Sequence, residues 1–549
     1  MKPIYTSHIT TQQIDRGNTD VILAADIIIL RGKSSLDDGF QVSEDAGGTW
    51  ADVDCRESKV ITSGQDVMIR ALNARITIEV ERKLLDYFVG DMGQRLPILT
   101  ADSGSGLARP AGLANMSAGG IAISPASGHA QGLINKLVAG AADAGILVVS
   151  DSTGNAVPTD PMSSLGEWPF RLAQWLAVQY PAYTVKIVPW DEVGEAAYGT
   201  PVTIQTGTGA RTLTIWNAAK SGSKSSYVLG SRYGVAVNKL PVVDLLIVNH
   251  GHNLYGAESQ DLIGLHYLEL TETVLLSHPG IGVLLIGQNP ARDTADNDIK
   301  VKAARDVCAL RGFGFVDVWS EFVKRGKAAS LYVDALHPST GVGTVEAPTG
   351  VDLFLSPLIA HFTGLAVEPA RCYSLLSDIK NAGNLLLNGD FSAFASALPD
   401  NWTASGATVT KDTTIPFGSN GYSVKIVNSG AAQGYIDQLL SSSLRDEYKG
   451  QTLICIAAVY VSVGQDDKSG RLALTSTSNS VNNYAAESGA EGGWRWKFLL
   501  AKTDVADTYI RVRLYGNTAF VAGGSTNFGA VYLRPGRMPP GRVPSAVIA

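Results

Sequence analysis

The sequence predicts a multidomain protein in which a central α/β domain with a parallel sheet is flanked by an N-terminal β-domain and a C-terminal β-sandwich. Three observations support this prediction. The 549 residues exceed what one hydrophobic core accommodates. Between Gly145 and about Gly364, apolar runs alternate with amphipathic helical segments, the pattern of βαβ units. On both sides of this region, short apolar or alternating runs are separated by turn residues, which indicates antiparallel β-structure.

Residues 1–92 are expected to form a small β-sandwich or barrel. The strand candidates there are Val21–Leu23, Ile27–Leu30, Val67–Ile69 and Ile76–Val80. Residues 93–144 are rich in Gly, Ala and Ser, so we expect a connector that wraps onto the next domain.

Residues 145–366 are expected to form a three-layer α/β domain, because helices that connect parallel strands cover both faces of the sheet. The strand candidates are residues 146–150, 184–188, 244–249, 281–287 and 313–318. The helix candidates are Leu165–Tyr180, Asp261–Leu276 and Asp298–Leu310. The segment Pro201–Asn217 is predicted to be a hairpin with residues 207–209 at its tip.

Residues 380–535 are expected to form the second β-domain, and residues 536–549 a Pro-rich extended tail. The opening segment Asn384–Phe391, followed by Pro399 and Trp402, resembles the start of jelly-roll carbohydrate-binding modules. This resemblance implies a jelly-roll-like sandwich in which Trp402 could stack on a sugar. The alternative is a sandwich that serves only structure or oligomerisation. Further strand candidates are Gln451–Val463, Trp494–Leu500 and Tyr509–Tyr515.

Composition excludes several classes of protein. The 44 Lys and Arg against 51 Asp and Glu give a net charge of −7, and no basic run stands out, so no nucleic-acid partner is expected. No run of 18 apolar residues predicts a membrane span, and no apolar segment near the N-terminus predicts a signal peptide. We therefore expect a soluble product, which could leave a cell by lysis or within a particle. Cys55, Cys308, Cys372 and Cys455 are scattered without a CxxC pair, which argues against zinc and a disulfide scaffold.

Ser152 is the candidate nucleophile. The apolar run Ile146–Val149 stops at small polar residues and Gly154, as a buried parallel strand does when it ends at the edge of a sheet. Helix capping is the ordinary alternative for a serine at this place. A similar segment, Ala101–Gly104, contains Ser103 but lacks partner motifs at suitable distances.

Asp334 and His337 are the candidate acid and base. A serine needs an adjacent imidazole to become nucleophilic, and the imidazole gains from an orienting carboxylate. The spacing of three residues predicts one helical or 3₁₀ turn with both side chains on the same face, ended by Pro338.

Two further polar segments could donate hydrogen bonds to a developing oxyanion. One contains Gly222 and the other contains Asn253, and each follows an apolar strand candidate. Asp151, His252 and Gln288 are candidates for lining the pocket, and Asp151, beside the nucleophile, is also expected to act as a structural hydrogen-bonding residue. His250 and His252 could instead bind a metal, but no acidic residue follows at ligand spacing, so no metal is expected, and the serine chemistry itself requires no cofactor.

These motifs together resemble the SGNH, or GDSL-like, hydrolase superfamily. The resemblance covers about residues 145–365 and maps the four name-giving residues to Ser152, Gly222, Asn253 and His337, with Asp334 as the acid. It implies an α/β esterase whose oxyanion hole comprises the Ser152 N–H, the Gly222 N–H and the Asn253 amide. Ser150 and Leu254 depart from the family pattern, which indicates a divergent branch.

The expected reaction is removal of O-acetyl groups from a polysaccharide. The order of domains is similar to that of tail-spike or tail-fibre deacetylases of bacteriophages. This similarity implies a location in the virion tail, contact with other virion proteins through the N-terminal domain, and a homotrimer. Two alternatives remain: a cellular lipase or arylesterase of the same superfamily, and a receptor-binding protein with a vestigial hydrolase domain.

Overall fold

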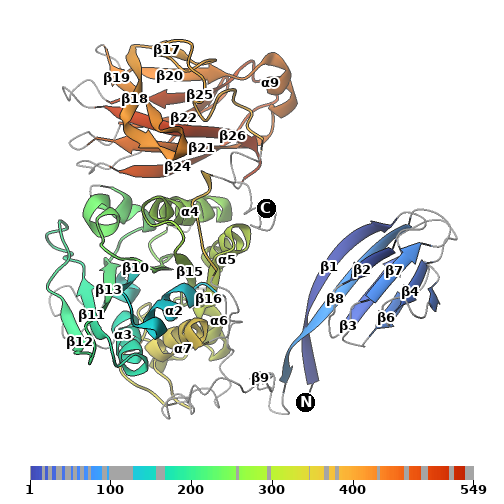
Figure 1. The fold of residues 1–549 in the computed structure, drawn as a ribbon, viewed down its shortest axis with the longest axis vertical. Coiled ribbons are helices and arrows are strands. Elements are labelled where there is room, and N and C mark those ends of the chain that lie inside the picture. The colour runs from blue at the N-terminus through green and yellow to red at the C-terminus, as the bar shows by residue number, and fades with distance from the viewer. Residues whose placement is uncertain are drawn as a thin grey trace. The chain divides into compact units, whose positions relative to one another are not determined.

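The computed structural model describes residues 128–537 except for 156–166, 231, 255–258, 294–297, 345, 364–369, 377–382, 430–432, 463–468, 484–492 and 518–524. It also gives backbone strands between residues 2 and 97. The chain forms two compact units, Met1–Ala122 and Ile123–Ala549. Figure 1 shows the all-β N-terminal unit and the larger second unit.

The N-terminal unit contains two antiparallel sheets. One has the order β1 (Lys2–Ile14), β8 (Ile76–Val89), β3 (Ile27–Gly32) and β6 (Ser58–Ile61), with β9 (Arg95–Pro97) also paired to β8. The other has the order β2 (Thr19–Ile22), β7 (Val67–Ala71), β4 (Phe40–Ser43) and β5 (Ala51–Val53). These sheets confirm the all-β class predicted for this region.

The segment expected to be a connector contains a helix. Helix α2 (Gln131–Ala139) buries Leu133 and Leu137, which lie four residues apart on one helical face. Gly140 ends the helix in a left-handed conformation with φ 62°. The high content of Gly, Ala and Ser concealed this short apolar stripe, so the helix was not predicted.

The central domain has a seven-stranded sheet whose neighbours are parallel except at one edge. Its order is β12 (Val202–Gln205), β11 (Thr184–Pro189), β13 (Thr212–Ala219), β10 (Ala144–Ser150), β14 (Leu245–Asn249), β15 (Gly282–Gly287) and β16 (Gly314–Asp317). Every residue of β10, β14 and β15 is buried, as expected for strands covered on both faces. The predicted α/β class is confirmed.

The predicted hairpin at Pro201–Asn217 is wrong. Strand β12 pairs antiparallel with β11, whereas β13 pairs parallel with both β11 and β10. The turn between β12 and β13 crosses the end of β11, where the Gly207 N–H donates to the Thr184 side chain at 3.1 Å. A glycine is needed there because a Cβ would meet the Tyr183 carbonyl carbon at 2.2 Å.

Helices form the outer layers of this domain (Figure 1). The longer helices are α3 (Trp168–Gln179), α4 (Gln260–Ser277), α5 (Ile299–Arg311), α6 (Val318–Lys324) and α7 (Gly350–Thr363). Helices α3 and α7 pack through Trp168 and Phe354, whose rings stack at 6.2 Å. Single-turn helices are η1 (Ser152–Gly154), η3 (Ser225–Leu229), η4 (Gly234–Asn238) and η5 (Ala329–Leu331).

The C-terminal domain is a sandwich of two antiparallel sheets, which confirms its predicted class. One sheet has the order β17 (Thr403–Ser405), β20 (Tyr435–Leu439), β25 (Ile510–Tyr515), β22 (Leu472–Ser476) and β23 (Ser480–Asn483). The other has the order β18 (Ala407–Phe417), β19 (Tyr422–Asn428), β26 (Thr526–Pro535), β21 (Thr452–Val461) and β24 (Trp494–Lys502). Two short helices, η6 (Gly418–Asn420) and α9 (Ser442–Tyr448), complete the domain.

The sandwich is docked on the central domain through β24 and α4. The side chains of Lys497 and Glu269 form a buried ion pair, and the backbone N–H of Trp496 donates to Thr273 Oγ1 at 3.1 Å. Trp496 is fully buried in the core that both domains share. The sheet with β20, β25 and β22 lies on the side of the sandwich away from α4 (Figure 1).

Trp402 does not offer a stacking surface. Its side chain is only 4% exposed and packs at 5.5 Å from Phe391 in the core of the sandwich. The expectation that Trp402 contacts sugar is therefore wrong. An aromatic near the start of a β-domain more often fills the core because it buries a large apolar area.

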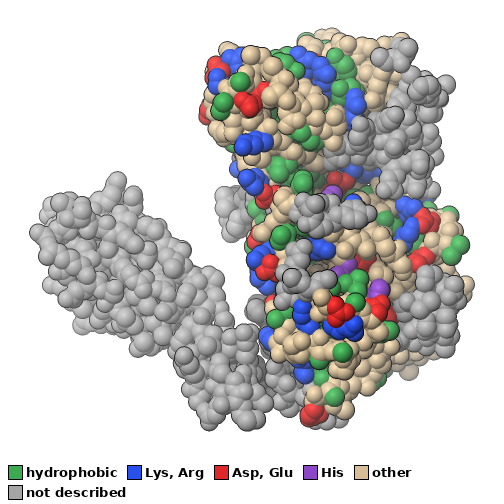
Figure 2. Space-filling view, turned by 180° about the vertical axis from the view of Figure 1, so that it is seen from behind, with side chains coloured by type: hydrophobic (Ala, Val, Ile, Leu, Met, Phe, Trp, Pro, Cys, Tyr) green, Lys and Arg blue, Asp and Glu red, His purple; other side chains and the backbone are tan. Residues whose placement is uncertain are grey.

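The surface mixes charges of both signs. Figure 2 shows acidic and basic side chains interspersed over the described residues of one face. Among the described residues, no helix has both the length and the apolar character needed to cross a membrane. No cluster of three or more His, Cys, Asp or Glu suited to a metal ion occurs within the described part of the chain.

Candidate active site

Ser152 lies where β10 ends. Asp151 begins the η1 turn: its Oδ1 accepts the Thr153 N–H at 3.0 Å and the Thr153 hydroxyl at 2.8 Å. The Asn155 N–H donates to the Ser152 carbonyl at 3.3 Å and closes the turn. A Cβ on Gly154 would meet Ser150 Oγ at 2.3 Å, so the tight turn depends on this glycine.

The structure brings Ser152, His337 and Asp334 together across the sheet edge. His337 Nε2 lies 2.9 Å from Ser152 Oγ, and His337 Nδ1 lies 2.7 Å from Asp334 Oδ2. Both distances are within hydrogen-bond range for a serine, a base and an orienting acid. The 185 residues that separate Ser152 from His337 in the chain make this contact a consequence of the fold.

The Asp334–His337 segment is a bend and not the helical turn that its spacing predicts. A bridge between Tyr332 and Pro338 closes the bend, and the Val333 N–H donates to the His337 carbonyl at 2.9 Å. The two side chains still meet because Asp334 Oδ1 accepts the backbone N–H of His337 at 2.7 Å. The predicted same-face placement is thus reached by an Asx-type bend.

Asp334 is an ionised acid over a wide pH range. Partial burial raises the pKa of its carboxyl, but hydrogen bonds from the backbone N–H groups of His337 and Leu336 and from the His337 ring lower it, with a net pKa of about 2. The side chains of Asp334 and His337 are 54% and 37% exposed, so solvent and substrate can reach them.

Gly222 and Asn253 lie on loops beside this constellation. The Lys220 N–H donates to the Ser150 carbonyl at 3.0 Å, which aligns the Gly222 loop with the end of β10. Gly222 has φ +70°, and open space surrounds its Cβ position. Asn253 Nδ2 donates to the Ser223 carbonyl at 3.0 Å, which orients the side-chain amide.

Two of the three pocket-lining candidates, Asp151 and Gln288, are buried, and His252 is half-buried. Asp151 is fully buried and Gln288 is 5% exposed, so Asp151 supports the Ser152 turn from below and does not line an open pocket. Gln288 Nε2 donates to Asp151 Oδ2 and to Thr153 Oγ1, each at 3.0 Å. The His252 N–H donates to Gln288 Oε1 at 3.0 Å, which connects this network to the Asn253 loop.

Burial and neighbouring polar groups together set the ionisation of the residues below the Ser152 turn. Burial raises the pKa of Asp151, but His252, His250 and the Gln288 amide lower it by a larger amount, so the net pKa lies below the ordinary value. Burial lowers the pKa of His250 to about 4, so its imidazole is neutral near pH 7. A buried carboxylate that accepts hydrogen bonds from Thr153 and Gln288 explains why an aspartate precedes Ser152.

Several supporting residues were missed from the sequence. Asn249 Nδ2 donates to Ser150 Oγ and to Thr153 Oγ1, each at 2.9 Å. Asn289 Nδ2 donates to the Leu336 carbonyl at 2.8 Å and so holds the bend that carries His337. Both asparagines come directly at or after the end of a buried strand, and this position was the only signal that could have found them.

Comparison with known proteins gives low similarity. No family model matches the chain, and no curated protein matches it. A crystal structure of a two-domain esterase (CEX) active on acetylated mannans, crystallised with mannopentaose, is 12% identical, with a TM-score of 0.34 over 77% of this chain and 98% of that one.

Two other solved structures overlap parts of the chain. The enzymatically active domain of bacteriophage CBA120 tailspike protein 4 is 13% identical, with a TM-score of 0.20 over 28% of this chain and 21% of that one. A xylan-binding domain from CBM 22 is 14% identical, with a TM-score of 0.23 over 29% of this chain and 99% of that one.

Proposed function

We propose that the protein is a serine esterase of the SGNH type that removes O-acetyl groups from a polysaccharide. The observation that carries the proposal is the hydrogen-bonded series Ser152 Oγ, His337 and Asp334, with distances of 2.9 and 2.7 Å. To Gly222 and Asn253, whose loops are joined by the bond from the Asn253 amide to the Ser223 carbonyl, the proposal assigns the donors that acyl transfer also requires.

The proposed chemistry follows from these positions. His337 Nε2 takes the proton of Ser152 while Oγ attacks the acetyl carbonyl carbon, and the carbonyl oxygen becomes an oxyanion. The N–H groups of Ser152 and Gly222 and the Asn253 amide stabilise that charge. When the tetrahedral species collapses, His337 returns the proton to the sugar oxygen and an acetyl-Ser152 ester remains. Water activated by His337 then releases acetate and restores the serine. Asp334 orients the imidazole and stabilises its cationic form.

A polysaccharide substrate is proposed from the docked sandwich. With Trp402 buried, the candidate sugar-contacting surface is the outer face of the sheet away from α4. The half-buried Tyr435 lies there, and the guanidinium of Arg513 lies 4.5 Å from its ring; the neighbouring Tyr515, 5.3 Å away, is buried and supports it. Flat aromatic and guanidinium groups suit contact with sugar rings and hydroxyls.

Acetate release from a panel of acetylated bacterial surface polysaccharides tests the proposal. We expect release from at least one polymer and a higher rate on acetyl than on octanoyl esters. A preference for octanoyl esters would favour the lipase or arylesterase alternative. Loss of activity with a chelator and recovery with zinc would favour a metal site at His250 and His252 over the serine mechanism.

The role of the sandwich has a separate test. Tyr435→Ala should weaken deacetylation of the polymer and leave hydrolysis of a small acetyl ester unchanged, because only the polymer spans both sites. Equal activity of variant and intact protein on both substrates would assign the sandwich to structure or assembly.

We also propose that the N-terminal unit attaches the protein to a phage virion and that the chain forms a homotrimer. This proposal rests on a separate all-β unit that precedes the esterase domain. Light scattering of the purified protein and detection of the chain in intact virions test it. A monomer in solution would contradict the trimer, and absence from virions would contradict the attachment.

A further inference from the structure

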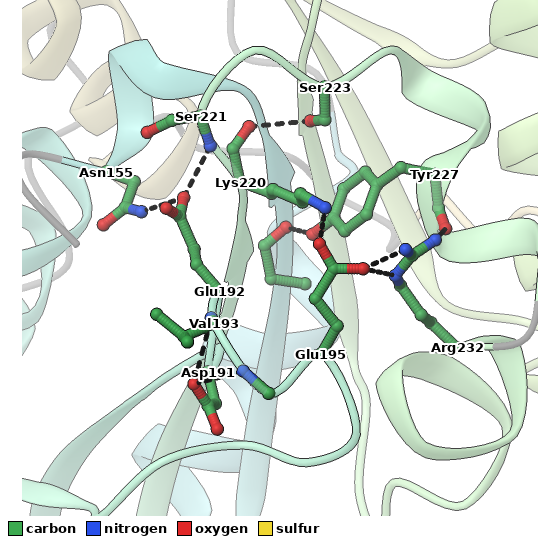
Figure 3. Close-up of polar contacts among 12 residues, drawn as sticks. Asn155, Asp191, Glu192, Val193, Glu195, Lys220, Ser221, Ser223, Tyr227 and Arg232 are labelled. Carbon is green, nitrogen blue, oxygen red and sulfur yellow. Dashed lines mark hydrogen bonds and ion pairs between the residues drawn. The ribbon is translucent and has the colours of Figure 1, made fainter.

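Two glutamates lie beside the loop that carries Gly222. Both belong to residues 190–199, between β11 and β12 (Figure 3). Glu192 Oε1 accepts the Ser221 N–H at 2.5 Å, and the Asn155 side-chain amide donates to the same oxygen. Ser221 directly precedes Gly222, and Asn155 directly follows the η1 turn that holds Ser152.

We propose that Glu192 is a positioning residue that clamps the Ser152 turn to the Gly222 loop. This inference rests on the proposed esterase function. A single oxygen that accepts from both segments fixes their separation, and that separation sets the distance from Ser152 Oγ to the Gly222 N–H. Displacement by about 1 Å of a group that must be aligned in a transition state can cost roughly 10²-fold in rate.

The platform that carries Glu192 is itself held in place. Asp191 Oδ1 accepts the N–H groups of Val193 and Gly194 at 3.1 and 3.0 Å, which closes a turn around Glu192. The flanking residues Trp190 and Tyr198 form a bridge, and their rings meet edge to face at 5.1 Å. A carboxylate on such a turn can hold the loop it contacts, whereas one on a freely moving loop could not.

Glu195 contacts the same loop in a different way. Its carboxylate pairs with the side chain of Lys220 and accepts from Arg232 Nε at 2.8 Å (Figure 3). The Lys220 backbone is fixed independently, through its N–H bond to the Ser150 carbonyl. Loss of Glu195 therefore removes side-chain ion pairs and leaves the backbone bond at Lys220, so Glu195 is a matched control on the same turn.

Geometry and charge make opposite demands on Glu192. Glu192 bonds to Ser221, the neighbour of Gly222, so its negative charge disfavours an oxyanion bound at Gly222. A purely electrostatic influence would therefore give Glu192→Gln a higher kcat than the intact protein. The amide oxygen of glutamine can accept both hydrogen bonds, so a clamp predicts that Glu192→Gln keeps most activity. Glu192→Ala removes both bonds and should lose activity.

The experiment measures kcat and KM on a small acetyl ester, backbone hydrogen exchange of the segment 217–223, and Tm for three variants. Glu192→Ala should lower kcat by about 10- to 100-fold, below the cost of deleting a whole oxyanion donor, with KM changed less than threefold. It should also speed exchange at 217–223. Glu192→Gln should restore kcat to within about threefold. Glu195→Ala should lower Tm and leave kcat within about twofold.

Three results would overturn the clamp. They are a kcat of Glu192→Ala within twofold of the intact protein, an equal loss in Glu195→Ala, and unchanged exchange at 217–223. If the intact protein hydrolyses no acetyl ester and Ser152 takes no fluorophosphonate, the proposed function fails instead. The exchange data still decide whether Glu192 holds the loop, so the two failures are distinguishable.

Discussion

The two sides of the Ser152 turn differ in burial and in what their carboxylates do. Below the turn, Asp151 is fully buried and accepts hydrogen bonds from Thr153 and Gln288. Above it, Asp334 is 54% exposed and bonds to the half-exposed His337. Both acids have a pKa below the ordinary value, so ionisation alone does not separate a supporting carboxylate from one that works on a base. What distinguishes Asp334 from Asp151 is its exposure to solvent and its hydrogen bond to the imidazole of His337.

Removal of the Ser152 hydroxyl, which lies between the two sides, should lower kcat more than any other change. Ser152→Ala should abolish ester hydrolysis, with a loss on the order of 10⁶ in kcat, because the acyl group has no other acceptor. Ser103→Ala is the control, since Ser103 lies in a similar segment outside the described residues. Steady-state kinetics with circular dichroism checks the result. Normal turnover in a folded Ser152→Ala protein, or loss in Ser103→Ala, would refute the assignment.

Asp334 and Asp151 should respond differently to the same isosteric substitution by asparagine. Asp334→Asn should lower kcat by roughly 10⁴-fold with little change in Tm, because it disturbs the tautomer and the cationic form of His337. Asp151→Asn should lower stability by about 1–3 kcal/mol, because a buried acceptor that faces donors is replaced. Kinetics and thermal unfolding of both variants check the contrast. Similar profiles for the two would remove the distinction between the upper and lower sides.

A smaller loss is expected at the oxyanion hole. Asn253→Ala should lower kcat by about 10²–10³-fold, the cost of one donor, with a smaller effect on KM. The Ser223 carbonyl would also lose its Nδ2 donor, so Tm should be recorded alongside the rates. A rise in KM with unchanged kcat would assign Asn253 to substrate binding.

The smallest effect is a pH dependence of stability at Asp151. An acid whose pKa is lowered on folding stabilises the protein fully above its unfolded value, and this contribution fades as pH falls through the folded value. The difference in unfolding free energy between the intact protein and Asp151→Asn should therefore be constant above about pH 5 and shrink below the ordinary pKa of 3.8. Denaturant titrations across this range measure it. A difference that grows in acid would contradict the lowered pKa.

The sequence predicts the central sheet better than its edges. The apolar runs of β10, β14 and β15 are found within one or two residues because buried parallel strands have no polar interruption. The predicted pairing of β12 was wrong because turn residues do not indicate which strand a segment pairs with. The predicted exposure of Trp402 was wrong because a sequence shows that an aromatic is present and not which way it points.

The site divides in the same way. The structure brings Ser152, Asp334 and His337 together, and each lies at the end of a predicted strand or in a short motif. Gly222 and Asn253 stay predictions as oxyanion donors. Glu192 carries no such pattern: it contacts Ser221, 29 residues away, from an irregular loop. Contacts of that kind depend on tertiary structure and cannot be predicted from the local periodicity of the sequence.

The most direct test of the central claim is covalent labelling with a fluorophosphonate, followed by mapping of the modified peptide. The reagent reacts with a serine only when an adjacent base activates it, so it reports the Ser152–His337 contact itself. The account predicts one adduct on Ser152, no adduct in Ser152→Ala, and slow labelling in a folded His337→Ala variant. An unlabelled intact protein, or an adduct on another serine such as Ser103, would contradict it.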